Sequence, residues 1–215
     1  MLPIKIVATG LYAPGKPIGN EELKKLAGIE FDHEKIEDKI GIKQRHIAHF
    51  RNLNETTADF VTKSAEEALK NGGLSADDIG LFIVATDTPE YITPATAIIQ
   101  QGRLQKGEKW SMSFDVSASC ASFTMAFDTA SRILANNPKI KYALITGVYN
   151  MPAFIRQGDK FSYPIFADGA GSFILTKDES SKSAYIGNQM LTDGTQFDFI
   201  GIYAGGSKMP VTKEI

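Results

Sequence analysis

The chain has 215 residues, enough to bury a sizeable hydrophobic core in one domain or in one large half of a two-part architecture. Hydrophobic residues make up 43% of it and charged residues 22%, close to the averages for folded globular proteins, which excludes a disordered or fibrous chain. Its formal net charge of −2 supplies no basic field for nucleic acid or an anionic membrane, so we expect neither partner.

The first elements of the chain are predicted from short apolar runs and from residues that start and stop helices. Residues 2–10 are apolar, rich in β-branched side chains and stopped by glycine, which predicts a buried strand. Asn20 can cap a helix over 21–27, which Gly28 ends. The polar stretch 32–39 predicts a second short helix.

The clearest amphipathic helix covers residues 56–69, where apolar positions recur at helical spacing before the terminating residues 71–73. Residues 75–78 resemble a capping box with Asp in place of Glu. Thr93 followed by Pro94 predicts the N-cap and first position of a helix that runs to about residue 105.

The remaining elements alternate between strands and helices, which predicts an α/β fold with a mainly parallel sheet covered by helices. Residues 178–182 are polar and serine-rich and are the best candidate for a structural boundary. The expected strands cover 81–85, 110–116, 142–147, 171–176 and 185–191, with a long helix over 121–135.

The only cysteine, Cys120, is placed where a strand ends and a helix begins. Free backbone N–H groups and the positive end of the helix dipole stabilise a thiolate at such a position, and they can also hold an oxyanion. A nucleophile of this kind suits acyl transfer through a thioester. However, free cysteine is among the most buried residue types, and a cysteine flanked by alanine and serine is usually inert core. Placement alone leaves both interpretations open.

The segment Phe-Asp-Val-Ser-Ala-Ser-Cys-Ala-Ser-Phe at 114–123 resembles the nucleophile segment of β-ketoacyl-acyl-carrier-protein synthase III, a thiolase-like family. Three more segments agree with this family in order and spacing, so the resemblance spans nearly the whole chain. They are 41–48, 84–86 with Pro94 downstream, and 166–171.

The resemblance implies a thiolase-like fold, which consists of two similar halves, each a sheet with covering helices. Residues 1–177 would form the first half and carry the nucleophile. Residues 178–215 would supply the opening strand and a loop of the second half, whose remainder is missing. We therefore expect a fragment of a longer enzyme, or a half that associates with another chain.

The mechanism implied by the resemblance has two stages. Cys120 takes an acyl group from acyl carrier protein or acyl-coenzyme A, with its own backbone N–H as an oxyanion donor. The acyl-enzyme then condenses with malonyl-acyl carrier protein and releases carbon dioxide. The family's enolate-stabilising histidine and asparagine come from the second half, so we expect no condensation by this chain alone. The family also implies a homodimer joined through residues 110–116. We expect no cofactor and no metal.

Departures from the family pattern concern the acyl donor. Lys35 stands where bacterial fatty-acid members have a tryptophan for the coenzyme A adenine, and Ala153 aligns with an arginine of the same clamp. Thr93 replaces the usual aromatic residue beside the acyl pocket. Together with Phe154 and Phe166, which border the acyl tunnel in the family or form core, Thr93 is a candidate substrate-binding residue. These changes favour a specialised acyl donor over acetyl-coenzyme A.

Alternative functions remain open on the sequence. The chain could be a non-catalytic partner subunit of a complete synthase, or an enzyme of acyl transfer without condensation or of the hydroxymethylglutaryl type. His46 and His49 have H-x-x-H spacing, but without a carboxylate or cysteine at ligand spacing they indicate structural rather than metal-binding histidines. The absence of an export signal, together with one unpaired cysteine, predicts a cytoplasmic location.

Overall fold

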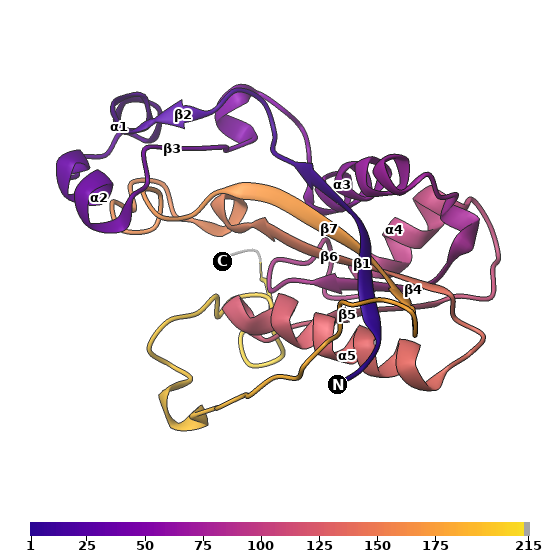
Figure 1. The fold of residues 1–215 in the computed structure, drawn as a ribbon. Helices are drawn as coiled ribbons and strands as arrows, with labels where there is room; N and C mark the ends of the chain where they lie inside the picture. The colour runs from indigo at the N-terminus through magenta and orange to yellow at the C-terminus, as the bar shows by residue number, and fades with distance from the viewer. Residues whose placement is uncertain (213–215) are drawn as a thin grey trace.

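The computed structural model describes residues 1–212, and its centre is a five-stranded mixed sheet with helices on both faces (Figure 1). β4 pairs in parallel with both β5 and β6, whereas β7 pairs antiparallel with β6 and β1. The α/β class is confirmed, but antiparallel pairing takes a larger share than predicted, because β7 follows β6 without a crossover helix. Across the sheet the order is β1 (Ile4–Tyr12), β7 (Asp168–Lys177), β6 (Tyr142–Asn150), β4 (Ile79–Ala85) and β5 (Met112–Val116).

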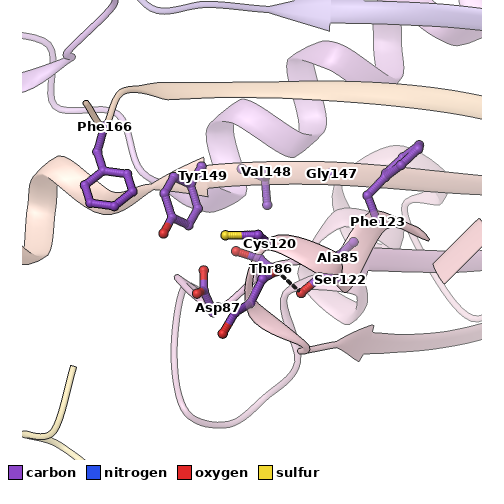
Figure 2. A pocket seen from close by; sticks show the side chains of 11 residues that line it. Ala85, Thr86, Asp87, Cys120, Ser122, Phe123, Gly147, Val148, Tyr149 and Phe166 are labelled. Atoms are coloured by element: carbon purple, nitrogen blue, oxygen red, sulfur yellow. Dashed lines mark hydrogen bonds between the residues drawn. The ribbon is translucent and has the colours of Figure 1, made fainter. Parts of the chain in front are cut away.

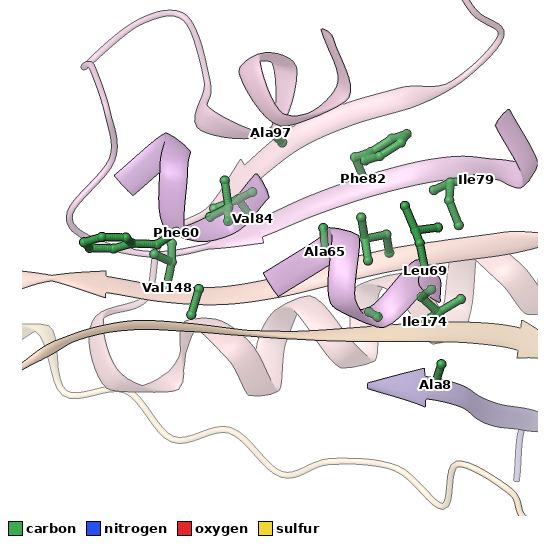
Figure 3. Packing of buried hydrophobic residues seen from close by; sticks show 14 of the residues in the cluster. Ala8, Phe60, Ala65, Leu69, Ile79, Phe82, Val84, Ala97, Val148 and Ile174 are labelled. Carbon is green, nitrogen blue, oxygen red and sulfur yellow. The ribbon is translucent and has the colours of Figure 1, made fainter. Parts of the chain in front are cut away.

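The interior strand β4 sends alternate side chains into two separate cores. Phe82 and Val84 pack under α3 (Thr57–Gly72) and α4 (Thr96–Gln105), and Figure 3 shows this cluster. Leu81 and Ile83 pack on the opposite face against α5 (Ser122–Asn136). Because neither face of β4 meets water, its sequence is apolar at every position except Gly80.

A small outlying unit, at the upper left of Figure 1, contains the antiparallel pair of β2 (Ile18–Gly19) and β3 (Gln44–Arg45) and the two helices between them, α1 (Asn20–Ala27) and α2 (His33–Ile40). Its core contains Ile18, Leu23, Ile47 and Tyr163. Asp32 caps the start of α2 and Gly28 caps the end of α1, and both residues adjoin their helices in the sequence. The predicted bounds of both helices therefore agree with the structure within one residue.

Asn20 is not the cap of α1 that the sequence predicts. It is the first residue of the helix, and its side-chain amide donates to Glu37 Oε1 at 2.8 Å and to the Ile42 carbonyl at 3.0 Å. The side chain therefore ties α1 to the end of α2, and Gly19 takes the N-cap position.

The predicted helix start at Thr93 and Pro94 is also wrong, because α4 begins at Thr96 after the N-cap residue Ala95. The side chain that caps this helix comes from β5: Asp115 accepts the backbone N–H groups of Thr96 at 2.7 Å and Ala97 at 2.8 Å. A cap supplied by a neighbouring strand leaves no signal in the local sequence.

We expect Asp115→Ala to lower the free energy of unfolding by about 1–2 kcal/mol, because two N–H groups at the start of α4 lose their acceptor. Urea denaturation followed by circular dichroism measures this loss. Asp115→Asn keeps one acceptor oxygen, so its free energy of unfolding should lie between those of the wild type and Asp115→Ala. Equal stability of the alanine variant and the wild type would contradict the capping role.

Two predicted strands differ from the structure. β1 was predicted to be buried, but it is an edge strand in which Lys5, Ile6 and Leu11 are exposed. The strand predicted at 185–191 is absent: Tyr185 forms one antiparallel bridge with Leu2, and residues 186–191 are exposed. A strand needs a partner backbone, and the segment has only this single bridge to Leu2, just before β1.

Beyond Lys177 the described chain is largely irregular, with one short 3-10 helix at Gly194–Gln196. No helix within residues 1–212 is both long enough and apolar enough to cross a membrane.

Candidate active site

Cys120 lies in a cavity of about 310 Å³ at the edge of the sheet where the parallel strands β5, β4 and β6 end (Figure 2). The carboxyl ends of parallel strands form the binding edge of open α/β sheets. Here the residues just after β4, just after β5 and at the end of β6 meet in one place. The lining includes Thr86, Asp87, Ser119, Cys120, Val148, Tyr149 and Phe166.

The turn that carries Cys120 is held by hydrogen bonds from Ser122, the first residue of α5. Its buried hydroxyl accepts the N–H of Ala118 at 2.8 Å and donates to the carbonyl of Ser119 at 2.7 Å. Ser119 has a φ of 47°, a left-handed conformation that is uncommon for a residue with a side chain. Such strain is maintained only where surrounding contacts determine it, as Ser122 does here.

Cys120 is exposed, which contradicts the interpretation of an inert core cysteine. It belongs to the 3-10 helix Ser119–Ala121, which joins the end of β5 to the start of α5, so the predicted strand-to-helix placement is confirmed. Figure 2 shows its sulfur directed into the cavity. A thiol presented in this way is accessible to a ligand that enters from outside.

Asp87 and Tyr149 also line the cavity, although no motif in the sequence indicates them. Burial, together with the nearby Asp87 and Cys120, raises the pKa of Tyr149 to about 12. The phenol therefore keeps its proton at neutral pH. The missed signal was positional, because Asp87 follows β4 and Tyr149 lies near the end of β6, at the sheet edge where sites form.

The three predicted substrate-binding residues lie in different places. Phe166 lines the cavity with Cys120. Phe154 is in the 3-10 helix Met151–Phe154 and is 46% exposed, and Thr93 is exposed in the loop before α4. The structure thus brings Phe166 to Cys120, and it leaves Phe154 and Thr93 outside the lining of this cavity.

A second cavity of about 420 Å³ lies beside His49, Glu55 and the buried Asp168. Asp168 Oδ2 accepts the N–H of Ala48 at 2.7 Å, but Oδ1 is buried without a partner within residues 1–212. Burial raises the pKa of Asp168 to about 6. The described part of the chain contains no cluster of three or more His, Cys, Asp or Glu that could hold a metal ion.

The raised pKa of Asp168 predicts a specific pH dependence of stability. The folded state binds a proton more tightly than the unfolded chain, so the contribution of Asp168 to stability falls as the pH rises from about 4 to about 6. Asp168→Asn removes this titration and can still accept the Ala48 N–H. We expect the variant to gain stability relative to the wild type between pH 4.5 and 7.5 on the order of 1–2 kcal/mol. Urea denaturation at both pH values measures the gain. The same difference in unfolding free energy between variant and wild type at both pH values would contradict the predicted titration of Asp168.

The mixed sheet between two helical layers, with a cysteine at a strand-to-helix turn, defines a thiolase-like α/β half. Residues 114–194 match the family model for 3-oxoacyl-[acyl-carrier-protein] synthase III. A β-ketoacyl-[acyl-carrier-protein] synthase III from Wolbachia of Brugia malayi is 36% identical, over 88% of this chain and 58% of the relative. One from Clostridium perfringens is also 36% identical, over 92% of this chain and 58% of the relative.

Solved structures agree with these relatives. The 3-oxoacyl-[acyl-carrier-protein] synthase III from Aquifex aeolicus is 34% identical with a TM-score of 0.73, and the match covers 82% of this chain and 54% of the solved chain. The enzyme of the same name from Pseudomonas aeruginosa is 25% identical with a TM-score of 0.80, and the match covers 91% of this chain and 59% of the solved chain. The chain is a homologue of β-ketoacyl-[acyl-carrier-protein] synthase III and corresponds to its N-terminal part. It spans 58% of the length of the curated relatives named above.

Proposed function

We propose that Cys120 is the nucleophile of an acyltransferase and forms an acyl thioester. The observation that carries this proposal is the exposed thiol directed into a cavity at the start of α5. The thiolate attacks the carbonyl carbon of an acyl thioester, and the backbone N–H of Cys120 donates to the oxyanion of the tetrahedral intermediate. The carrier thiolate then leaves and takes up the proton that Cys120 released.

The donor is an acyl group on acyl carrier protein or coenzyme A, and the full reaction is condensation of the acyl-enzyme with malonyl-acyl carrier protein. This stage belongs to fatty-acid or related biosynthesis in the cytoplasm. Support comes from the relatives, which carry the name β-ketoacyl-[acyl-carrier-protein] synthase III. In this proposal residues 1–177 supply the acyl-carrying half, and residues 178–215 begin a second half that completes the condensation site.

Two copies of the chain pair through β5 in this proposal. β5 is an edge strand of the sheet, and Met112 at its start is 44% exposed. The preceding Trp110 is fully exposed, so a large apolar surface adjoins this edge. A strand edge with exposed apolar side chains is suited to pairing with another chain.

Incubation of the purified chain with butyryl-N-acetylcysteamine tests the acyl-transfer stage. We expect a mass increase of one butyryl group on the peptide that contains Cys120, and hydroxylamine should remove the group because it cleaves thioesters. An unmodified chain after prolonged incubation, at a pH where small thiols exchange readily, would contradict the proposal.

A further inference from the structure

The cavity contains a polar pair, Asp87 and Tyr149, that the acyl transfer proposed above does not use. Asp87 follows β4 by two residues and Tyr149 lies near the end of β6, so two neighbouring parallel strands carry both to the same rim. Both residues line the cavity with Cys120. Figure 2 shows the Tyr149 hydroxyl and the Asp87 carboxyl group on the side of the cavity where the Cys120 sulfur lies.

Asp87 is the unusual member of this pair. Its Oδ1 atom is buried and has no hydrogen-bond partner in the described chain. Buried polar atoms are nearly always paired, so an unpaired carboxyl oxygen marks a position where a donor is missing. Rotation about the Cβ–Cγ bond is soft, which lets either oxygen turn toward the cavity. Thr86, Ser119 and Ser122 also line the cavity and carry hydroxyl groups, but none of them bonds Asp87 Oδ1 within residues 1–212.

Tyr149 complements this acceptor. Its half-buried phenol keeps its proton, as described above, and can donate to an oxygen atom in the cavity. The structure shows no hydrogen bond between the side chains of Tyr149 and Asp87, although both lie within residues 1–212. The Tyr149 hydroxyl is thus a donor and the Asp87 carboxyl group an acceptor, and they do not bond to each other.

We propose that Cys120 accepts a short acyl group that carries a hydroxyl, which donates to Asp87 and accepts from Tyr149. An aliphatic group of the same size would leave the carboxyl oxygen without a donor. Sites built in this way discriminate against the analogue that lacks the hydroxyl. This inference rests on the proposed function, because it names the substrate class of the same cysteine.

The first test uses thiol reagents, because these need no acyl transfer. 2-Hydroxyethyl methanethiosulfonate and propyl methanethiosulfonate have equal numbers of heavy atoms and differ in a terminal hydroxyl or methyl group. The sulfur of Cys120 forms a disulfide with the reagent, methanesulfinate leaves with the bonding electron pair, and the thiol proton goes to solvent. Intact mass spectrometry gives both rates, which are divided by the rates measured with glutathione to remove intrinsic reactivity.

We expect the normalised rate to be about tenfold higher for the hydroxyethyl reagent. The preference should vanish in Asp87→Ala, remain in part in Asp87→Asn, which keeps one acceptor oxygen, and decrease in Tyr149→Phe. Asp77→Ala is the matched control, because this exposed carboxyl group pairs with Lys109 near the opposite end of β4. Equal normalised rates in the wild type, or a preference that survives in Asp87→Ala, would overturn the inference.

The second test compares 3-hydroxypropionyl-N-acetylcysteamine with butyryl-N-acetylcysteamine, which again match in size. Faster acylation of Cys120 by the hydroxyacyl thioester, with loss of this preference in Asp87→Ala, supports the inference. Equal acylation by both thioesters contradicts the inference and leaves the proposed function intact. If the reagents show the preference but neither thioester acylates Cys120, the proposed function fails and the hydroxyl selectivity of the cavity stands.

Discussion

Cys120→Ala should abolish acylation of the chain by a thioester, and Cys120→Ser should slow it on the order of 10³-fold or more. A serine hydroxyl is a far weaker nucleophile than a thiolate at neutral pH, and alanine has no nucleophile. Because Cys120 is exposed, neither substitution opens a cavity in the core. The acylated fraction, followed by intact mass spectrometry with butyryl-N-acetylcysteamine, measures both effects.

Thermal unfolding provides the control for these variants. Both should unfold within a few degrees of the wild type, so that the loss of acylation is assigned to the sulfur atom. The stated role of Cys120 is refuted if the alanine variant is still acylated at a rate similar to that of the wild type, because another residue must then hold the acyl group.

Gly10→Ala should give the largest loss of stability among the substitutions considered, about 3 kcal/mol or more. A Cβ atom at Gly10 would lie 2.2 Å from the carbonyl oxygen of Ser64 and 2.4 Å from the backbone nitrogen of Ala68. Both atoms belong to the backbone of α3, so relief requires moving the helix away from β1. Urea denaturation measures the change in the free energy of unfolding.

Gly171→Ala is the matched control, because Gly171 lies in β7 opposite Leu11, next to the register position of Gly10. A Cβ atom there meets no heavy atom within 4 Å. We expect a change within about 0.5 kcal/mol, since the added methyl group also restricts the unfolded chain. Similar losses at the two glycines would show that the close approach of β1 to α3 is not what limits substitution at Gly10.

Local signals account for what the sequence could predict of the fold. α2 starts at its cap Asp32, and α1 and α3 end at Gly28 and Gly73, both in the left-handed conformation. The start of α4 could not be predicted, because its cap Asp115 is supplied by another strand. The antiparallel direction of β7 was missed for a related reason, since strand direction depends on how the connection after β6 returns to the sheet.

The same distinction applies to the site. The turn around Cys120 could be predicted because a strand, a cysteine and a helix follow one another in the chain. Its exposure could not, because free cysteine is among the most buried residue types and the small neighbours Ala121 and Ser122 give no sign of exposure. Asp87 and Tyr149 are brought to the cavity by parallel pairing of β4 and β6, which appears only once the sheet order is known.

The two outer edges of the sheet differ in a way that limits how copies of the chain can assemble. On β1, the Asn71 side chain donates to the Thr9 carbonyl and the Glu67 carboxylate accepts the Leu11 N–H, so side chains of α3 occupy edge positions that an added strand would need. β5 remains the accessible edge. Strand addition at one edge only ends after two copies, whereas a sheet that is open at both edges can grow into a fibre.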